Sequence, residues 1–104
     1  MDAERLQFLR ESIRAKPADT FARYALALEL TRSGESTEAL EQFEYLMQNH
    51  PDYSPTYYQA GTLLASLDRA EEARKAFTKG LEVTHRLGQK HAESELRAAL
   101  DELE

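Results

Sequence analysis

Apolar residues recur along this chain at intervals of three and four positions, which is the spacing of one face of an α-helix. Leu40, Phe43 and Met47 illustrate this spacing, with mostly charged or polar residues between them. The pattern predicts about six amphipathic helices in antiparallel order. They are expected within residues 1–16, 20–33, 36–50, 54–67, 68–86 and 90–104.

The expected helix ends coincide with residues that cap or break helices. Residues whose side chains can accept hydrogen bonds from backbone amides precede four of the helices: Asp19 or Thr20, Ser36, Ser54 and Asp68. Gly34 and Gly88 are placed to end helices, because glycine adopts the left-handed conformation that follows a last turn. Pro51 requires the preceding helix to stop before it. These signals divide the chain into helix pairs joined by short turns.

The sequence also repeats itself at an offset of 34 residues. The matching pairs are Pro17 and Pro51, Tyr24 and Tyr58, Leu30 and Leu64, Glu38 and Glu72, Ala39 and Ala73, and Phe43 and Phe77. They put a proline just outside a helix, a bulky apolar residue in each helix, and a small residue where two helices cross. The period therefore predicts a repeated antiparallel helical hairpin.

Composition supports an all-α fold of one domain. The 104 residues are rich in alanine, leucine, glutamate and arginine, while Val83 and Ile13 are the only valine and isoleucine. A formal net charge of −6 argues against nucleic-acid and anionic-membrane partners, which require basic surfaces. The chain has no cysteine and no twenty-residue apolar run, and its first residues do not resemble a secretory signal. A cytoplasmic location is the expectation.

The repeated positions resemble those of the tetratricopeptide repeat family, whose unit is a 34-residue helical hairpin. With Thr20 as its first position, the first unit matches the family pattern at Leu26, Ala27, Leu30, Gly34, Ala39, Phe43 and Pro51. The second unit, from Ser54, matches it at Tyr57, Ala60, Gly61, Leu64, Ala73, Phe77 and Gly80. The resemblance implies a right-handed α-α superhelix with an N-terminal capping helix (1–16), two repeats (20–53 and 54–87) and a C-terminal capping helix (88–104).

Three positions depart from the family pattern. Arg23 replaces an aromatic residue in the first unit, Asp68 replaces the turn glycine of the second unit, and His85 occupies the second unit's terminal proline position. The missing proline predicts that the second hairpin is longer at its end.

The resemblance implies a non-catalytic protein–protein interaction module that binds a partner segment on its concave surface, which the first helix of each hairpin lines. In this register, the partner-binding residues are Phe21, Tyr24, Leu28, Arg32, Tyr58, Gln59 and Thr62. The lysine and asparagine of family members that hold a C-terminal carboxylate are absent, since the first unit has Tyr24 and Leu28 at these positions. A partner with apolar side chains, extended or helical, is expected, with Arg32 as one anchoring charge.

Two alternatives remain open for function. The chain could act as a self-association or scaffold module, forming a homodimer through the concave aromatic residues or through Leu96, Leu100 and Leu103. It could also be a fragment of a longer regulatory protein of this family, because three or more stacked units are usual. Phe21 or Tyr24 could instead be covered by the N-terminal helix, which would remove them from any binding surface.

No constellation of catalytic or metal-binding residues is evident in the sequence. His50 is in a turn, and His85 and His91 are six residues apart, so the latter two do not share a helical face. Glycine-rich phosphate loops and paired-histidine motifs are absent. We therefore expect no enzymatic activity, no cofactor and no metal.

Overall fold

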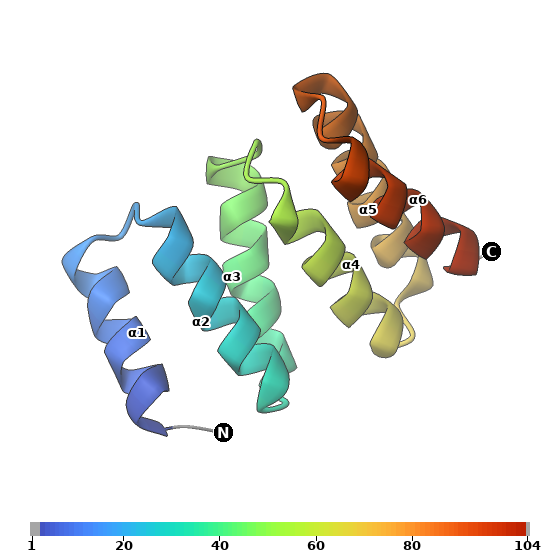
Figure 1. Ribbon diagram of the computed structural model, residues 1–104. Coiled ribbons are helices and arrows are strands. Elements are labelled where there is room, and N and C mark those ends of the chain that lie inside the picture. Colours follow the sequence, from blue (N-terminus) through green and yellow to red (C-terminus); the bar gives the residue numbers. More distant parts are fainter. Residues whose placement is uncertain (1–2, 104) are drawn as a thin grey trace. The chain divides into compact units, whose positions relative to one another are not determined.

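A computed structural model describes residues 3–103, which form six helices and no strand. The helices are α1 (Ala3–Ala15), α2 (Thr20–Arg32), α3 (Ser36–Asn49), α4 (Pro55–Ser66), α5 (Ala70–Leu87) and α6 (Lys90–Leu103) (Figure 1). Among the described residues, the helix ends agree with the expected ranges to within about two residues; residues 1, 2 and 104 of the expected terminal helices lie outside the described residues. The predicted all-α array of antiparallel helical hairpins is therefore confirmed. The chain divides between His50 and Pro51 into two compact units, α1 to α3 and α4 to α6.

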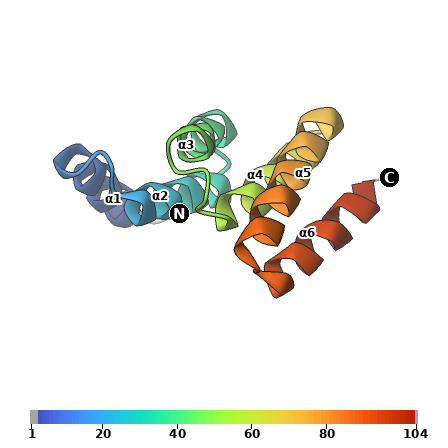
Figure 2. The same cartoon turned by 90° about the horizontal axis from the view of Figure 1, so that it is seen from above.

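In the first unit, α2 and α3 form a hairpin and α1 packs against α2. Figure 2 shows α1 and α3 on different sides of α2. The buried apolar side chains of this unit are Leu9, Ala22, Leu26, Ala27, Leu30, Ala39, Phe43 and Leu46. Ala27 and Ala39 are fully buried, which agrees with the expectation of small residues where the helices cross.

Ion pairs connect α1 to the hairpin. The Arg5 Nε atom donates to the Glu29 Oε1 atom at 2.9 Å, and Arg32 Nη1 donates to the same oxygen at 3.0 Å. The residue Glu29 is only 7% exposed, so these two arginines compensate a largely buried carboxylate. Arg10 donates to both carboxylate oxygens of Glu38 on α3.

The turns of the first unit confirm one predicted cap and correct another. The Ala22 amide donates to Asp19 Oδ1 at 3.1 Å, so Asp19 caps α2. Ser36 is not a cap: it is the first residue of α3, and the capping position belongs to Glu35. The reason lies in Gly34, whose φ of +82° turns the backbone sharply, so that the Glu35 carbonyl already accepts from the Ala39 amide.

In the second unit, α4 and α5 form a hairpin, and α6 packs against both helices. The buried apolar side chains are Tyr57, Ala60, Leu63, Leu64, Ala73, Ala76, Phe77, Val83 and Leu96. Two glycines permit close helix contacts here. A Cβ atom at Gly61 would lie 2.4 Å from the Phe77 ring, and one at Gly80 would lie 2.6 Å from Tyr57 Cβ and 3.0 Å from Leu96 Cδ1. Gly80 therefore allows α5 to pack closely against α4 and α6 together.

One predicted cap in the second unit is right in position only, and the other is wrong: Ser54 is the capping residue of α4 but its side chain bonds no helix amide. Ser54 precedes Pro55 at the start of α4, but its hydroxyl makes no cap and instead donates to Gln89 Oε1 at 2.5 Å. Asp68 does not cap α5, whose capping residue is Arg69. Asp68 has a φ of +61° and takes the left-handed conformation that Gly34 has in the first hairpin. The Ser54 hydroxyl is thus used by Gln89, and Asp68 lies one residue before the capping position of α5.

Candidate functional site

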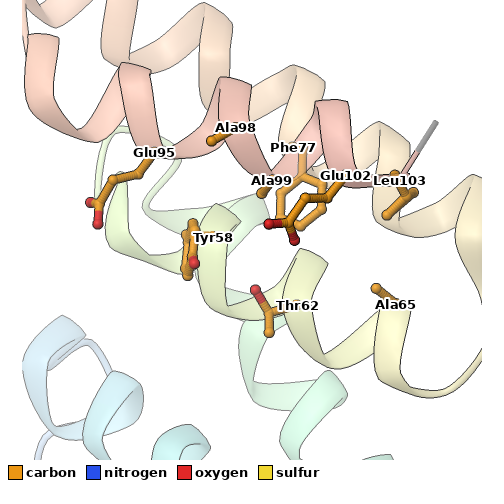
Figure 3. Close-up of a pocket in the computed structure, with 9 residues that line it drawn as sticks. All are labelled: Tyr58, Thr62, Ala65, Phe77, Glu95, Ala98, Ala99, Glu102 and Leu103. Carbon is orange, nitrogen blue, oxygen red and sulfur yellow. The ribbon is translucent and has the colours of Figure 1, made fainter.

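The second unit contains a groove of about 380 Å³ between α4 and α6 (Figure 3). Nine residues line it: Tyr58, Thr62, Ala65, Phe77, Glu95, Ala98, Ala99, Glu102 and Leu103. One wall is a stripe of α4 and the other is a stripe of α6, while Phe77 projects from α5 between them. The groove is thus lined by all three helices of this unit.

Apolar side chains form the interior of the groove. The ring of Tyr58 is tilted at 52° to the ring of Phe77, with centroids 6.3 Å apart. Tyr58 is 38% exposed, whereas Phe77 is buried, so an aromatic pair forms the interior and one member is accessible. Ala65, Ala98 and Ala99 leave room beside this pair because their side chains are short. The arrangement can receive apolar side chains of a partner.

Both carboxylates among the lining residues belong to α6. Glu95 and Glu102 are exposed and seven residues apart, which places them on the same helical face. The Glu95 Oε1 atom lies 3.7 Å from His91 Nε2 on the preceding turn. Lysine and arginine are absent from the described residues that line the groove. One wall is therefore acidic.

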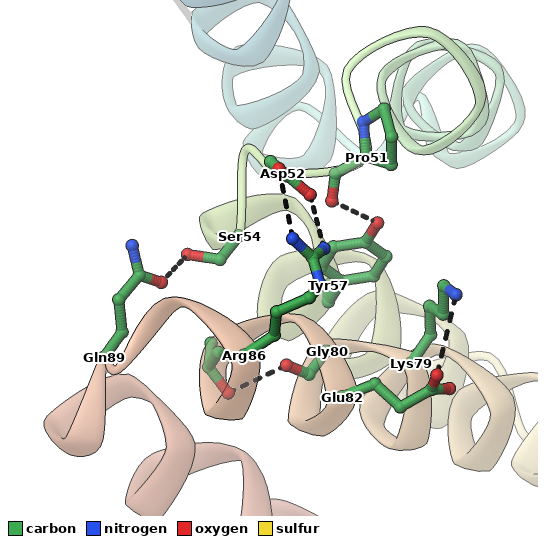
Figure 4. A network of polar contacts seen from close by, with 10 residues as sticks. Pro51, Asp52, Ser54, Tyr57, Lys79, Gly80, Glu82, Arg86 and Gln89 are labelled. Carbon is green, nitrogen blue, oxygen red and sulfur yellow. Dashed lines mark hydrogen bonds and ion pairs between the residues drawn. The ribbon is translucent and has the colours of Figure 1, made fainter.

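Local structure at the far end of α5 positions the acidic wall. Helix α5 ends at Gly88, whose φ of +71° reverses the chain, and α6 starts two residues later. The Gln89 amide donates a hydrogen bond to the Thr84 carbonyl at 2.8 Å. The Gln89 side-chain oxygen accepts a hydrogen bond from the Ser54 hydroxyl (Figure 4). The turn is thereby attached to the start of α4 as well as to the end of α5.

A polar network supports the same end of α4 (Figure 4). Arg86 on α5 donates to Asp52 Oδ1 at 2.6 Å, and the Tyr57 hydroxyl donates to the Pro51 carbonyl at 2.6 Å. The hydrogen bond from Arg86 holds the pKa of Asp52 below its ordinary value, and burial raises the pKa of Tyr57. The Arg86–Asp52 pair therefore connects the last turn of α5 to the segment that precedes α4.

The structure places the sequence-predicted binding residues in different settings. Tyr58 and Thr62 line the groove on α4, whereas Gln59 is half-buried and is not among the lining residues. On α2, Phe21 is 72% exposed, so the N-terminal helix does not cover it. Tyr24 and Leu28 are half-buried.

Arg32, the expected anchoring charge, is exposed and already pairs with Glu29. It shares a helical stripe with Phe21, Tyr24 and Leu28, and these four residues form what we call the α2 patch.

Sequence reasoning missed the contribution of α6 to the groove. The stripe of Leu96, Leu100 and Leu103 indicated how α6 packs, and Leu96 is indeed buried. The neighbouring residues Glu95 and Glu102 were not predicted to line a groove. Their i, i+7 spacing was the available signal, but it acquires meaning only when α6 lies beside α4.

The first unit has a smaller hollow of about 230 Å³, lined by Arg10, Ile13, Arg14, Leu26, Glu38 and Gln42. The Arg10–Glu38 ion pair crosses from α1 to α3 at this place. The hydrogen bonds from Arg10 hold the pKa of Glu38 below its ordinary value of 4.5. The paired charges give this hollow a structural role in holding α1.

Histidine and acidic residues do not cluster as metal ligands within residues 3–103. His85 Nδ1 lies 3.2 Å from Glu93 Oε2, and both belong to the α5–α6 turn region. Over the same residues, none of the helices combines the length and the apolar composition needed to span a membrane.

The fold defines a helical-hairpin repeat protein. A family model described as tetratricopeptide repeat matches residues 1–103. The chain is 39% identical to a tetratricopeptide repeat domain protein from Salinibacter ruber, whose solution structure has a TM-score of 0.81 over 86% of this chain and 90% of that one. The crystal structure of that domain has a TM-score of 0.77, over 82% and 96%.

Two further similarities extend the comparison. The chain is 32% identical over 72 residues to an uncharacterized protein of Methanocaldococcus jannaschii, which is 69% of this chain and 84% of that protein. A protein from Bordetella parapertussis shares the fold at 21% identity, with a TM-score of 0.83 over 99% of this chain and 89% of that one. The chain belongs to the tetratricopeptide repeat family, whose members are generally non-catalytic modules that bind protein partners.

Proposed function

We propose that this protein binds a segment of a partner protein and that the groove between α4 and α6 is the principal binding site. The observation that carries this proposal is the groove itself, in which the accessible Tyr58 ring, Thr62 and short alanines surround the buried Phe77. An exposed aromatic ring beside a hydrophobic interior is a typical anchor for a partner side chain. The module acts without catalysis, cofactor or metal, in the cytoplasm.

The α2 patch is a second contact surface for the partner in this proposal. Its support is the exposure of Phe21, which leaves most of an aromatic ring in water. Leu28 and Tyr24 extend the apolar stripe, and Arg32 adds a charge at its end. Gln59 stays a predicted contact on α4.

A peptide selection followed by calorimetry tests the proposal. Peptides selected from a random display library on the whole protein are titrated against the wild type and an Ala98→Arg variant. Ala98 is exposed on the α6 wall, so a long side chain fills the groove without disturbing the core. We expect Ala98→Arg to weaken binding by at least about ten-fold, equivalent to about 1.4 kcal/mol.

Two controls accompany this experiment. Thr78→Arg adds the same charge at an exposed position of α5 outside the groove lining and is expected to leave affinity unchanged. Phe21→Ala measures the contribution of the α2 patch. Selected peptides that bind Ala98→Arg as well as the wild type would contradict a site in this groove.

Self-association is the second candidate function, and the exposed Phe21 favours it because a second copy could cover this ring. Sedimentation velocity over a wide concentration range separates the two functions. A concentration-independent monomer supports peptide binding, whereas a dimer that is lost in a Tyr24→Ala, Leu28→Ala variant supports self-association.

A further inference from the structure

The two carboxylates of the α4–α6 groove restrict which partner fits it. Glu95 and Glu102 are separated by seven residues of one helix, which corresponds to about 10.5 Å along its axis. Both are exposed, and lysine and arginine do not occur among the described lining residues. A partner in the groove therefore meets an apolar interior bordered on one side by two negative charges.

From this charge pattern we infer that the occupant of the groove is a basic amphipathic helix, an inference that rests on the proposed function. Apolar side chains of the helix enter beside Tyr58 and Phe77, and lysine or arginine residues one i, i+7 step apart reach Glu95 and Glu102. All α-helices have the same rise per residue, so seven residues of the partner helix cover the same length as seven residues of α6. Both charge pairs therefore form together when the two helices lie parallel or antiparallel.

The small residues of the groove favour a helical occupant. Ala98 and Ala99 on α6 and Ala65 on α4 present short side chains to the space between the walls. Short side chains let a third helix approach two others closely, with its ridge of i, i+3, i+4 and i+7 residues in the groove between them. Figure 3 shows Ala98 and Ala99 on the α6 side of the groove and Ala65 on the α4 side.

Charge also argues against two other occupants. An acidic segment would place its carboxylates next to Glu95 and Glu102 and would be repelled further by the net charge of −6. A second copy joined symmetrically through this groove would bring Glu95 and Glu102 of both copies into one interface. A basic segment is instead attracted both by Glu95 and Glu102 and by the net negative charge of the protein.

Synthetic peptides test the inference directly. The probe is a capped, alanine-based peptide of about 15 residues, with lysines at positions i and i+7 and leucines at i+3 and i+4. The matched peptide has glutamates in place of the two lysines. Fluorescence anisotropy with the whole protein at low salt should show binding of the lysine peptide at least about ten-fold tighter than the glutamate peptide.

The matching protein variants identify the carboxylates responsible. Glu95→Gln with Glu102→Gln should weaken the lysine peptide by about five- to ten-fold, because each exposed charge pair contributes modestly. Glu41→Gln with Glu44→Gln removes two exposed charges from α3 and should change the affinity by less than about two-fold. Ala98→Arg should abolish binding of the lysine peptide.

The outcomes separate this inference from the proposed function. If the glutamate peptide binds as tightly as the lysine peptide and Ala98→Arg abolishes both interactions, the groove binds helices but the basic partner is wrong. Library-selected peptides that depend on Ala98 yet lack paired basic residues overturn the inference in the same way. If neither synthetic nor selected peptides respond to Ala98→Arg, the groove itself is not the site, and the proposed function fails.

Discussion

The two helical hairpins of this protein have nearly identical inner turns and different outer ends. In the α2–α3 turn, the Glu35 amide donates to the Leu30 carbonyl at 2.9 Å, and in the α4–α5 turn the Arg69 amide donates to the Leu64 carbonyl at 3.0 Å. Each donor and acceptor is displaced by the same 34 residues. The backbone of the turn is therefore repeated even though Gly34 in one hairpin corresponds to Asp68 in the other.

The outer ends differ because a proline is present in only one hairpin. Helix α3 has 14 residues and ends at Asn49, before Pro51. At the corresponding position the second hairpin has His85, and α5 continues to Leu87 for a length of 18 residues. This confirms the expected longer hairpin. In the second hairpin the chain reverses only at Gly88, and the following helix α6 packs against both α4 and α5.

The largest expected effect concerns the small residue at the helix crossing, which is Ala27 in one hairpin and Gly61 in the other. A methyl group at Gly61 would overlap the buried Phe77 ring, so we expect Gly61→Ala to destabilise the protein by about 2 kcal/mol despite the better helix propensity of alanine. Urea unfolding measures the change. Adding Phe77→Leu to Gly61→Ala should lower the cost of the alanine, and a more stable Gly61→Ala variant would refute the packing argument.

A smaller effect, in this case an increase in stability, is expected from a substitution at Thr56, which corresponds to the buried Ala22 of the first hairpin. Thr56 is fully buried, and its Oγ1 atom makes no hydrogen bond in the described structure. Replacing the hydroxyl by a methyl group in Thr56→Val should raise the free energy of unfolding by about 1 kcal/mol. Thr62→Val, at an exposed groove position, is the control and should change stability by less than about 0.5 kcal/mol. A loss of stability in Thr56→Val would mean that the hydroxyl has a partner.

Exchanging the two turn residues tests how much the positive φ at this position costs in each hairpin. Asp68→Gly should stabilise the protein by about 0.5–1 kcal/mol, because glycine takes a positive φ without steric cost. Gly34→Asp should destabilise it by a similar amount of about 0.5–1 kcal/mol, since a Cβ atom there meets nothing within 4 Å and only the backbone conformation resists. Thermal unfolding of both variants checks the opposite signs.

Asp68→Asn is the matched control for the charge of Asp68. Asparagine also tolerates a positive φ, so this variant reports the effect of the negative charge just after the end of α4, where the helix dipole disfavours it. If Asp68→Asn stabilises the protein as much as Asp68→Gly, charge rather than backbone strain explains the gain.

The smallest expected effect distinguishes the equivalent glutamates Glu38 and Glu72. Arg10 binds Glu38 from a different helix, whereas Arg69 binds Glu72 from three residues earlier in the chain. Glu38→Gln should cost about 0.5 kcal/mol at pH 7, a value kept small because the pair is partly exposed to solvent. Glu72→Gln should cause no measurable change.

The cost of Glu38→Gln should depend on pH. The pKa of Glu38 in the folded protein lies below its ordinary value of 4.5, so the unfolded chain takes up the proton first as the pH falls. The stabilisation is complete above pH 4.5 and is lost as the pH falls through the lowered pKa. Urea unfolding of the wild type and of Glu38→Gln should therefore converge in acid, and a difference that persists there would point to packing.

Much of the fold follows from short-range signals in the sequence. The 34-residue period, the apolar stripes and the left-handed glycines Gly34 and Gly88 were sufficient to predict the six helices. Capping was harder to predict. Ser36, Ser54 and Asp68 all have suitable side chains, but the backbone of each turn decides whether a side chain can reach an amide.

The candidate site was predictable only in part. Tyr58 and Thr62 were expected from the repeat register, and both line the groove. Glu95, Glu102 and Ala98 were not expected, because a helix of mixed charge has several plausible exposed faces. Contacts of α6 with α4 and α5 select one of them.

The helices and their pairing can be predicted from the sequence, because helical spacing, proline and glycine act over a few residues. Which exposed residues lie together in one groove depends on how the helices pack. Gly80 between Tyr57 and Leu96, and Gln89 bonded to Ser54, join residues far apart in the chain and place α6 beside α4. Such contacts depend on the shapes of three packed helices together, and no local pattern of residues specifies them.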